Sequence, residues 1–218
     1  MKPLFGTLLG TGALVALFLL GCCRQADIDH DGVVRIYCLG DSNTDAVWKG
    51  MNWPYTPRWC EKTAALCGHI RSGGAALPAE FTNVGYWGST ARDQHRFWRD
   101  APWQVGAAAK GRADGVVMLF GTNDITGLGA TPAQLVADLA AACARNPALP
   151  CYVGTQPATL GENVNPTPWA DAIRAQFGQH AIDMTTGIVP VAPGNYHIDD
   201  ASQDRIADRV RTALGCEP

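Results

Sequence analysis

The sequence predicts an α/β fold, a three-layer α/β/α sandwich whose central sheet has five parallel strands in the flavodoxin-like order 2-1-3-4-5. Apolar runs typical of strands alternate with helical patterns through the body of the chain, which indicates a parallel sheet covered on both faces. Right-handed crossovers restrict the strand order and place the switch point between the first and third strands. The expected strands lie near residues 33–39, 80–84, 115–120, 151–155 and 180–184. The expected helices lie near residues 55–67, 91–100, 132–145, 168–178 and 201–214.

Three of these helices carry local signals of their own. Thr131 to Gln134 reads as a capping box with proline at the first helical position. Thr167-Pro168 repeats the start in which a capping residue is followed by proline. The last helix places apolar residues at 206, 210 and 214, which lie on one helical face.

The N-terminal 21 residues read as an export signal, because one charge at Lys2 precedes an apolar stretch. The segment Leu19-Leu20-Gly21-Cys22 resembles a bacterial lipobox. This resemblance implies lipidation of Cys22 and a mature chain held at a membrane of the bacterial cell envelope. An uncleaved transmembrane anchor is the alternative, since the apolar stretch is near the ~20 residues that span a bilayer. Residues 22–32 are then expected to form a polar tether.

The remainder, residues 33–218, is expected to form one domain, because it is too short for two ordinary ones. The formal net charge is −3, and no run of Lys or Arg is present. Nucleic acid is therefore not expected as a partner. The oligomeric state is left open.

Eight cysteines in an exported chain indicate disulfide bonds. Cys143 and Cys151 are the favoured pair, because a chain reversal joins an expected helix end to an expected strand start. Cys60 and Cys67 would be ~10 Å apart on a continuous helix, so they can pair only if that helix ends early. Cys38 is expected to be a buried free thiol. With Cys22 lipidated, at least one cysteine lacks an intramolecular partner.

Two polar segments follow directly on strand-like apolar runs. Ser42 lies in Gly40-Asp41-Ser42-Asn43-Thr44, and Asn123 lies in Gly121-Thr122-Asn123-Asp124. Both groups should stand at carboxyl ends of strands, which is where an open α/β sheet binds ligands. A hydroxyl and a carboxamide delivered to one crevice indicate a nucleophile and an oxyanion donor.

Two further segments complete a set of four blocks. Residues 83–90 follow the second strand, and Tyr196-His197 precedes the last helix. In order and spacing, the four blocks resemble those of the SGNH hydrolase superfamily, also called GDSL esterases, from Val33 to Leu214.

The resemblance implies a role for each matching residue. Ser42 would be the nucleophile, and His197 would be its general base. The backbone N–H groups of Ser42 and Gly88 and the side-chain amide of Asn123 would form the oxyanion hole. The resemblance implies no cofactor, and the sequence shows no metal-ligand cluster.

One position departs from the family pattern. The family has an aspartate three residues before the histidine, where this chain has Gly194. Candidates for the group that orients His197 are a backbone carbonyl near Gly194 or Asn195, a carboxylate from Asp199 or Asp200, and the more distant Asp183. The two later aspartates read more simply as the N-cap of the final helix. A backbone carbonyl, and thus a Ser–His dyad, is the expectation.

Other candidate features have simpler interpretations. Residues 27–32 resemble the start of a calcium loop, but the twelfth position is Cys38 instead of glutamate, so a polar linker is expected. Trp87 is expected at the pocket wall, and part of the aromatic cluster after the nucleophile should pack the first helix onto the sheet. That cluster comprises Trp48, Trp53, Tyr55 and Trp59, and the histidines expected to be structural or solvated are His30, His69, His95 and His180.

The resemblance implies a serine esterase that cleaves a carboxylic ester through an acyl-enzyme. Short acyl groups, including O-acetyl groups on polysaccharides, are the expected substrates. A lysophospholipase or thioesterase acting on longer chains is one alternative. A non-catalytic envelope lipoprotein that binds glycan or lipid is another, and the same machinery would also allow acyl transfer to a hydroxyl other than water.

Overall fold

The computed structural model describes residues 27–45, 57–96, 113–145, 147–155 and 164–218. The expected export signal, Cys22 and three members of the aromatic cluster (Trp48, Trp53 and Tyr55) lie outside the described residues. Within the described ranges, no helix has the length and apolar character needed to cross a membrane.

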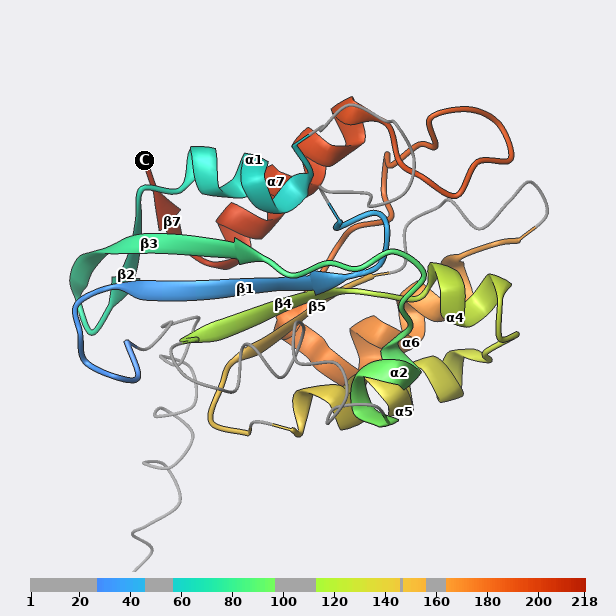
Figure 1. Ribbon diagram of the computed structural model, residues 1–218, viewed down its shortest axis with the longest axis horizontal. Coiled ribbons are helices and arrows are strands. Elements are labelled where there is room, and N and C mark those ends of the chain that lie inside the picture. Colours follow the sequence, from blue (N-terminus) through green and yellow to red (C-terminus); the bar gives the residue numbers. More distant parts are fainter. Residues whose placement is uncertain (1–26, 46–56, 97–112, 146, 156–163) are drawn as a thin grey trace, which may run out of the picture.

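The sheet has seven strands in the order β6-β5-β4-β1-β3-β2-β7 (Figure 1). Neighbouring strands from β6 to β3 pair in parallel, whereas β2 pairs antiparallel with both β3 and β7. The five expected strands correspond to β3, β1, β4, β5 and β6, which are parallel neighbours in the expected order. The expectation of a five-stranded, wholly parallel sheet is wrong in two respects, because the sheet is mixed and has two further strands. The strands are β1 (Val34–Gly40), β2 (His69–Ser72), β3 (Ala75–Asn83), β4 (Gly115–Leu119), β5 (Cys151–Gly154), β6 (Ala181–Ile182) and β7 (Cys216–Glu217).

The sequence did contain a signal for one of the missed strands. β2 and β3 are joined by Gly73-Gly74, and both glycines have positive φ, +60° and +96°. Two consecutive residues with positive φ form the tight turn that fits the twist of a two-stranded hairpin. β3 begins at Ala75, directly after this turn, whereas the expected strand began near residue 80.

The helices cover both faces of the sheet. In Figure 1, α1 and α7 lie on one face, and α2, α5 and α6 lie on the other. The helices are α1 (Trp59–Leu66), α2 (Ala91–Arg96), α4 (Thr122–Thr126), α5 (Pro132–Cys143), α6 (Thr167–Phe177) and α7 (Asp200–Ala213), with a 3-10 turn η1 at Gly178–His180. The short α4 was not expected from the sequence. It begins after Gly121, whose φ is +132°.

Each face of the sheet has its own apolar core. Val34, Ile36 and Cys38 of β1 pack beneath α1 and α7, whereas Leu39 belongs to the cluster beneath α2, α5 and α6. Side chains of a strand alternate between faces, and a parallel sheet covered on both sides buries both sets. The carboxyl ends of the strands stay outside the two cores, where loops can carry functional groups.

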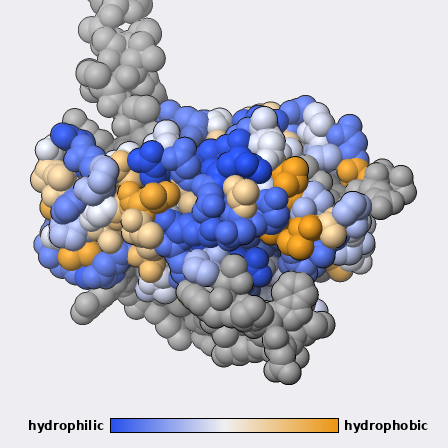
Figure 2. Space-filling model, turned by 90° about the horizontal axis from the view of Figure 1, so that it is seen from above, coloured by the Kyte–Doolittle hydropathy of each residue, from blue (hydrophilic) through white to orange (hydrophobic). Residues whose placement is uncertain are grey.

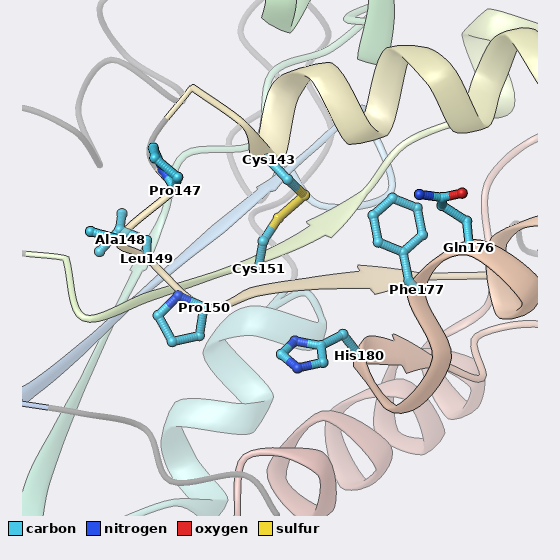
Figure 3. A pocket seen from close by; sticks show the side chains of 9 residues that line it. All are labelled: Cys143, Pro147, Ala148, Leu149, Pro150, Cys151, Gln176, Phe177 and His180. Atoms are coloured by element: carbon cyan, nitrogen blue, oxygen red, sulfur yellow. A yellow bond between two sulfur atoms is a disulfide. The ribbon is translucent and has the colours of Figure 1, made fainter. Parts of the chain in front are cut away.

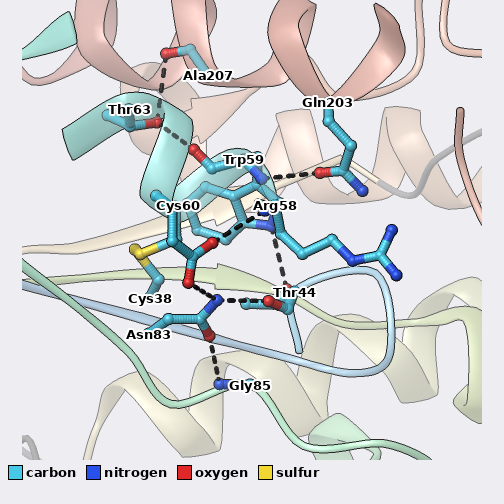
Figure 4. The surroundings of a disulfide bond; sticks show 11 residues. Cys38, Thr44, Arg58, Trp59, Cys60, Thr63, Asn83, Gly85, Gln203 and Ala207 are labelled. Atoms are coloured by element: carbon cyan, nitrogen blue, oxygen red, sulfur yellow. Dashed lines mark hydrogen bonds between the residues drawn. A yellow bond between two sulfur atoms is a disulfide. The ribbon is translucent and has the colours of Figure 1, made fainter. Parts of the chain in front are cut away.

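Three disulfides are present among the described residues: Cys38–Cys60, Cys67–Cys216 and Cys143–Cys151. The last is the pairing favoured from the sequence. The expectation that Cys38 is a free thiol is wrong, because α1 packs over β1 and sets Cys60 above it (Figure 4). Cys60 and Cys67 do not pair with each other. Cys60 lies in the first turn of α1 and bonds to Cys38 of β1, whereas Cys67 is the C-cap of α1 and bonds to Cys216 of β7.

The described part of the expected tether, residues 27–32, is fastened to the domain. The Asp27 N–H donates to Ser72 Oγ at 3.1 Å, and the Ile28 N–H donates to Asp114 Oδ1 at 2.6 Å. These residues therefore lead directly into β1 at the amino-terminal edge of the sheet.

Candidate active site

Ser42 lies in a tight turn at the carboxyl end of β1. The N–H groups of Thr44 and Asp45 both donate to the Asp41 carbonyl at 3.0 Å. Gly40 makes this turn possible, because a Cβ at that position would collide with the Thr44 hydroxyl and lie 2.5 Å from the Leu119 carbonyl. The turn leaves Ser42 half-buried at the edge of the sheet.

His197 comes from the loop between β6 and α7 and contacts the serine. Its Nε2 lies 3.0 Å from Ser42 Oγ, although the two residues are 155 positions apart. The loop is held as a narrow hairpin, since the Val191 N–H donates to the His197 carbonyl at 2.8 Å. The structure thus brings the expected nucleophile and base within hydrogen-bonding distance.

The other ring nitrogen of His197 faces Asn195. Asn195 Oδ1 lies 3.1 Å from His197 Nδ1 and also accepts the His197 backbone N–H at 2.8 Å. A backbone carbonyl near Gly194 or Asn195 was expected at this place. The partner in the structure is instead the side-chain oxygen of Asn195.

The three aspartates considered for this role have other partners. Asp199 caps α7 by accepting the Ser202 N–H at 2.7 Å, and Asp200 pairs with Lys62 at 2.8 Å. Asp183 accepts the N–H groups of the two threonines that follow it. Although burial raises the pKa of Asp183, these hydrogen bonds and the Arg209 charge lower it to about 2. In these contacts Asp199 stabilises a helix end, Asp183 a turn, and Asp200 the pairing of α7 with α1.

The turn that carries Gly88 is joined to both the serine turn and Asn123. The Tyr86 N–H and the Ser89 hydroxyl donate to the Gly40 carbonyl at 2.9 and 3.1 Å. Asn123 Nδ2 donates to the Ser89 carbonyl at 3.0 Å. The structure therefore joins the segments that carry Ser42, Gly88 and Asn123, which follow three separate strands.

Gly88 itself has a conformational reason to be glycine. Its φ is +76°, and a Cβ built there would have nothing within 4 Å. The left-handed backbone, more than crowding, therefore favours glycine at this position. The adjacent Trp87 is 54% exposed, at the surface beside the site.

Asn43 is a site residue that the sequence analysis missed. Its buried side chain donates to the Tyr196 carbonyl at 3.2 Å and accepts the Ile198 N–H at 3.1 Å. It therefore holds both chain neighbours of His197 from the position next to Ser42. An asparagine in a turn carries no sequence signal for such a contact, because it is an ordinary turn residue.

Helix α1 and the end of β3 support the serine turn from the other side. The indole N–H of Trp59 donates to the Thr44 hydroxyl at 3.1 Å, and Asn83 Nδ2 donates to the Thr44 carbonyl at 2.6 Å (Figure 4). The Cys38–Cys60 disulfide ties the same helix to β1, four positions before Ser42. Trp59 is fully buried, in agreement with the packing role expected for that cluster.

Burial determines the charge state of the two titratable groups nearest Ser42. It lowers the pKa of His197, and the Arg58 charge lowers it further. It raises the pKa of Asp41 to about 7, and the neighbouring Asp124 adds to this rise. A histidine with a lowered pKa is neutral at neutral pH, which is the state that a general base requires.

The surface also has features away from these residues. An open depression at the amino end of β5 is lined by the Cys143–Cys151 disulfide, Phe177 and His180 among others (Figure 3). It lies at the opposite ends of the strands from Ser42, so it is separate from the candidate active site. Viewed over the face with α1 and α7, the described surface is mainly hydrophilic with separate apolar patches (Figure 2).

A group of carboxylates lies at the same amino-terminal edge. Asp27, Asp29 and Asp114 place one oxygen each within 4.8 Å of one another. Both oxygens of Asp114 already accept backbone N–H groups, from Ile28 and Arg35. These contacts give the cluster a structural role in joining the N-terminal segment to β4.

Three of the other histidines have places that do not involve the serine turn. His30 and His69 are exposed, and His180 stacks on Tyr152 with ring centroids 5.0 Å apart. The side chain of His95 lies outside the described residues.

Comparison with solved structures shows the same fold in several esterases. An aryl esterase from M. smegmatis has a TM-score of 0.60 and 17% identity, over 83% of this chain and 100% of that one. The acetylxylan esterase Axe2 from Geobacillus stearothermophilus gives 0.61 and 16%, over 84% and 95% of the two chains. A carbohydrate esterase family 3 protein from Talaromyces cellulolyticus gives 0.56 and 18%, over 83% and 96%.

A search of curated proteins found no match. The profile of one family matches residues 38–212, which is most of the chain and includes Ser42, Gly88, Asn123 and His197. The protein therefore belongs to the GDSL-like lipase/acylhydrolase family.

Proposed function

We propose that the protein is a serine esterase that hydrolyses short-acyl esters, in particular O-acetyl groups on carbohydrate, through an acyl-enzyme on Ser42. Ser42 Oγ attacks the ester carbonyl while its proton passes to His197 Nε2. The leaving alkoxide then takes that proton, which leaves the acyl group on the serine. Water attacks the acyl-enzyme with the same histidine as base, and Ser42 recovers its proton as the acid is released.

The single observation that carries this proposal is the contact between Ser42 Oγ and His197 Nε2 at 3.0 Å. A serine hydroxyl is a weak nucleophile until a base accepts its proton, and this distance allows that transfer. The Gly88 turn and Asn123 are hydrogen bonded to each other and to the serine turn. They supply donors for the oxyanion that forms at the carbonyl.

Exposed aromatic side chains beside the site support a carbohydrate substrate. Tyr86 and Trp87 lie on the Gly88 turn, and Tyr196 precedes the histidine. Their exposed fractions are 49%, 54% and 47%. Flat aromatic faces pack well against sugar rings, and the names of two of the structural neighbours refer to acetylxylan and to carbohydrate esters.

A longer acyl chain is the second candidate, because aliphatic side chains are also exposed near these loops. Leu128 follows α4, and Val189 and Val191 lie in the loop that carries the histidine. Hydrolysis of p-nitrophenyl esters from acetate to palmitate separates the two substrates. We expect the highest kcat/KM at acetate, and a maximum at the long chains would favour a lysophospholipase or thioesterase.

Covalent labelling tests the serine mechanism directly. We expect an organophosphonate to modify the wild-type protein at Ser42, and to leave the Ser42→Ala variant unmodified. The His197→Ala variant should be labelled far more slowly, since the base is absent. A wild-type protein that remains unlabelled would instead be a glycan- or lipid-binding lipoprotein.

A separate experiment distinguishes hydrolysis from acyl transfer. The reaction is run with an added alcohol, and its products are analysed for the free acid and for the new ester.

The site of action is proposed from the N-terminal sequence. The resemblance of Leu19 to Cys22 to a lipobox supports a lipid anchor in the bacterial cell envelope. In a bacterial host, we expect the wild-type protein in the membrane fraction and the Cys22→Ser variant without lipid. Equal lipid labelling of both proteins would contradict the anchor.

A further inference from the structure

We infer that Asn195 is the residue that positions the general base, with a neutral amide in place of the aspartate of the family pattern. The inference rests on the roles proposed above for Ser42 and His197. It differs from the expected dyad because a side chain, not the backbone, holds the imidazole.

The hydrogen bonds define which atom of the amide faces the ring. Asn195 Oδ1 accepts the His197 backbone N–H at 2.8 Å, so this atom is the carbonyl oxygen, since an amide nitrogen can only donate. The same oxygen lies 3.1 Å from Nδ1 of the ring. Nδ1 therefore carries the proton, and the lone pair of Nε2 faces Ser42 Oγ at 3.0 Å. This is the tautomer that a base requires.

The orientation of the amide matters, because an asparagine whose nitrogen faces the ring would stabilise the wrong tautomer of the histidine. When asparagine replaces the aspartate of a serine-protease triad, kcat falls about 10⁴-fold because the imidazole adopts the wrong tautomer. In this protein the backbone N–H of His197 holds the oxygen toward the ring. The amide therefore orients the base without adding a negative charge.

The backbone explains why position 194 does not supply the carboxylate. Gly194 has a φ of +74°, a conformation that side-chain-bearing residues rarely adopt. The Asn195 N–H then closes the turn by donating to the Ala192 carbonyl at 3.0 Å. This turn directs the next side chain, Asn195, onto the histidine.

Burial lowers the pKa of the His197 imidazole, and the Arg58 charge lowers it further. Arg58 is itself influenced by the carboxylates of Asp45, Glu61 and Asp200. A carboxylate at position 195 would stabilise the imidazolium, whereas the amide does not. The acid limb of kcat/KM should therefore lie below pH 6.5, the ordinary pKa of histidine.

Two substitutions at this position test the inference. In Asn195→Ala we expect kcat to fall about 10- to 100-fold while KM changes by less than about twofold, because the ring loses its orientation. In Asn195→Asp we expect activity to be retained and the acid limb to move to higher pH. Asp199→Ala is the matched control, and it should keep the wild-type pH profile.

A spectroscopic readout avoids dependence on the substrate. Proton NMR should show a downfield Nδ1 proton of His197 in the wild type and in Asn195→Asp, and no such signal in Asn195→Ala. A kcat within about threefold of wild type in Asn195→Ala, or an unshifted acid limb in Asn195→Asp, would overturn the inference. If Ser42 resists labelling, the esterase proposal fails, and the NMR signal still tests Asn195.

Discussion

Asn123 has a structural contact in addition to its proposed role in the oxyanion hole. Its amide nitrogen donates one hydrogen bond to the Ser89 carbonyl, at 3.0 Å. A carboxamide has a second N–H to offer an oxyanion. In the proposed mechanism, the same group that holds the Gly88 turn in place would also donate to the oxyanion.

Removal of this donor gives the first prediction. We expect Asn123→Ala to lower kcat for p-nitrophenyl acetate by about 10²- to 10³-fold, the usual cost of losing one oxyanion donor. The melting temperature, measured in parallel, should fall only modestly, since one hydrogen bond is lost. A variant with wild-type kcat would remove Asn123 from the oxyanion hole.

Asp41 gives a prediction about the pH dependence of stability. Burial raises its pKa to about 7 in the folded protein, from an ordinary value of 3.8. Between these values the folded chain keeps a proton that the unfolded chain releases, so the contribution of this group to stability falls as pH rises. At 1.4 kcal/mol per pKa unit, the effect is about 4 kcal/mol at most.

We therefore expect Asp41→Asn to reduce the loss of unfolding free energy between pH 5 and pH 8. The amide is uncharged throughout this interval, and its oxygen can still accept the Asn43 N–H that Asp41 accepts at 2.9 Å. Urea unfolding of both proteins at the two pH values makes the measurement. Identical losses in wild type and variant would show that Asp41 is ionised in the folded state.

Asn43 joins two loops that carry residues of the candidate site. The serine turn follows β1, and the histidine loop precedes α7. Asn43 links them through the Tyr196 carbonyl and the Ile198 N–H, and Gln203 of α7 donates to the Asn43 carbonyl at 3.2 Å. The distance between nucleophile and base thus depends on this buried side chain.

Asn43→Ala should therefore impair both stability and catalysis. Each buried group that loses its partner costs about 1–3 kcal/mol, and the histidine loop is freed on both sides of His197. We expect kcat to fall more than tenfold, roughly as for other misplaced catalytic groups. Gln203→Ala is the control, because it loses contacts to Asn43 and Trp59 without releasing the loop. Equal kcat values for the two variants would contradict the role of Asn43.

For the whole molecule, the three disulfides connect elements over very different distances along the chain. Cys67–Cys216 joins the end of α1 to β7 over 149 positions, whereas Cys143–Cys151 spans only 8. A cross-link stabilises mainly by restricting the unfolded chain, and the effect grows with the loop that it closes. Disulfides also form mainly in oxidising compartments, which supports the proposed export.

The Cys67–Cys216 disulfide, which closes the longer loop of chain, should contribute more to stability than Cys143–Cys151. We expect the Cys67→Ser/Cys216→Ser double variant to lose about 2–3 kcal/mol more unfolding free energy than the Cys143→Ser/Cys151→Ser variant. Denaturant unfolding under non-reducing conditions compares the two. A larger loss from the short loop would show that local packing, not chain entropy, dominates.

The alternation of strands and helices was readable from local patterns because hydrophobic periodicity depends on each segment alone. It placed Ser42 and Asn123 at strand ends, and the family resemblance added Gly88 and His197. The extra strands were missed for two reasons. The Gly73-Gly74 turn was not interpreted as a hairpin, and β7 has only two residues, too few for a periodic signal.

By itself, the sequence determined the layered architecture and, through the family blocks, which four residues to propose for the site, because strand ends and family blocks are local features. Only the tertiary structure decided which groups surround them. Asn195 beside His197, Asn43 beneath the histidine loop and Cys60 opposite Cys38 all depend on how distant segments pack. Such contacts follow from loop conformation and helix placement, which no single segment of the sequence encodes.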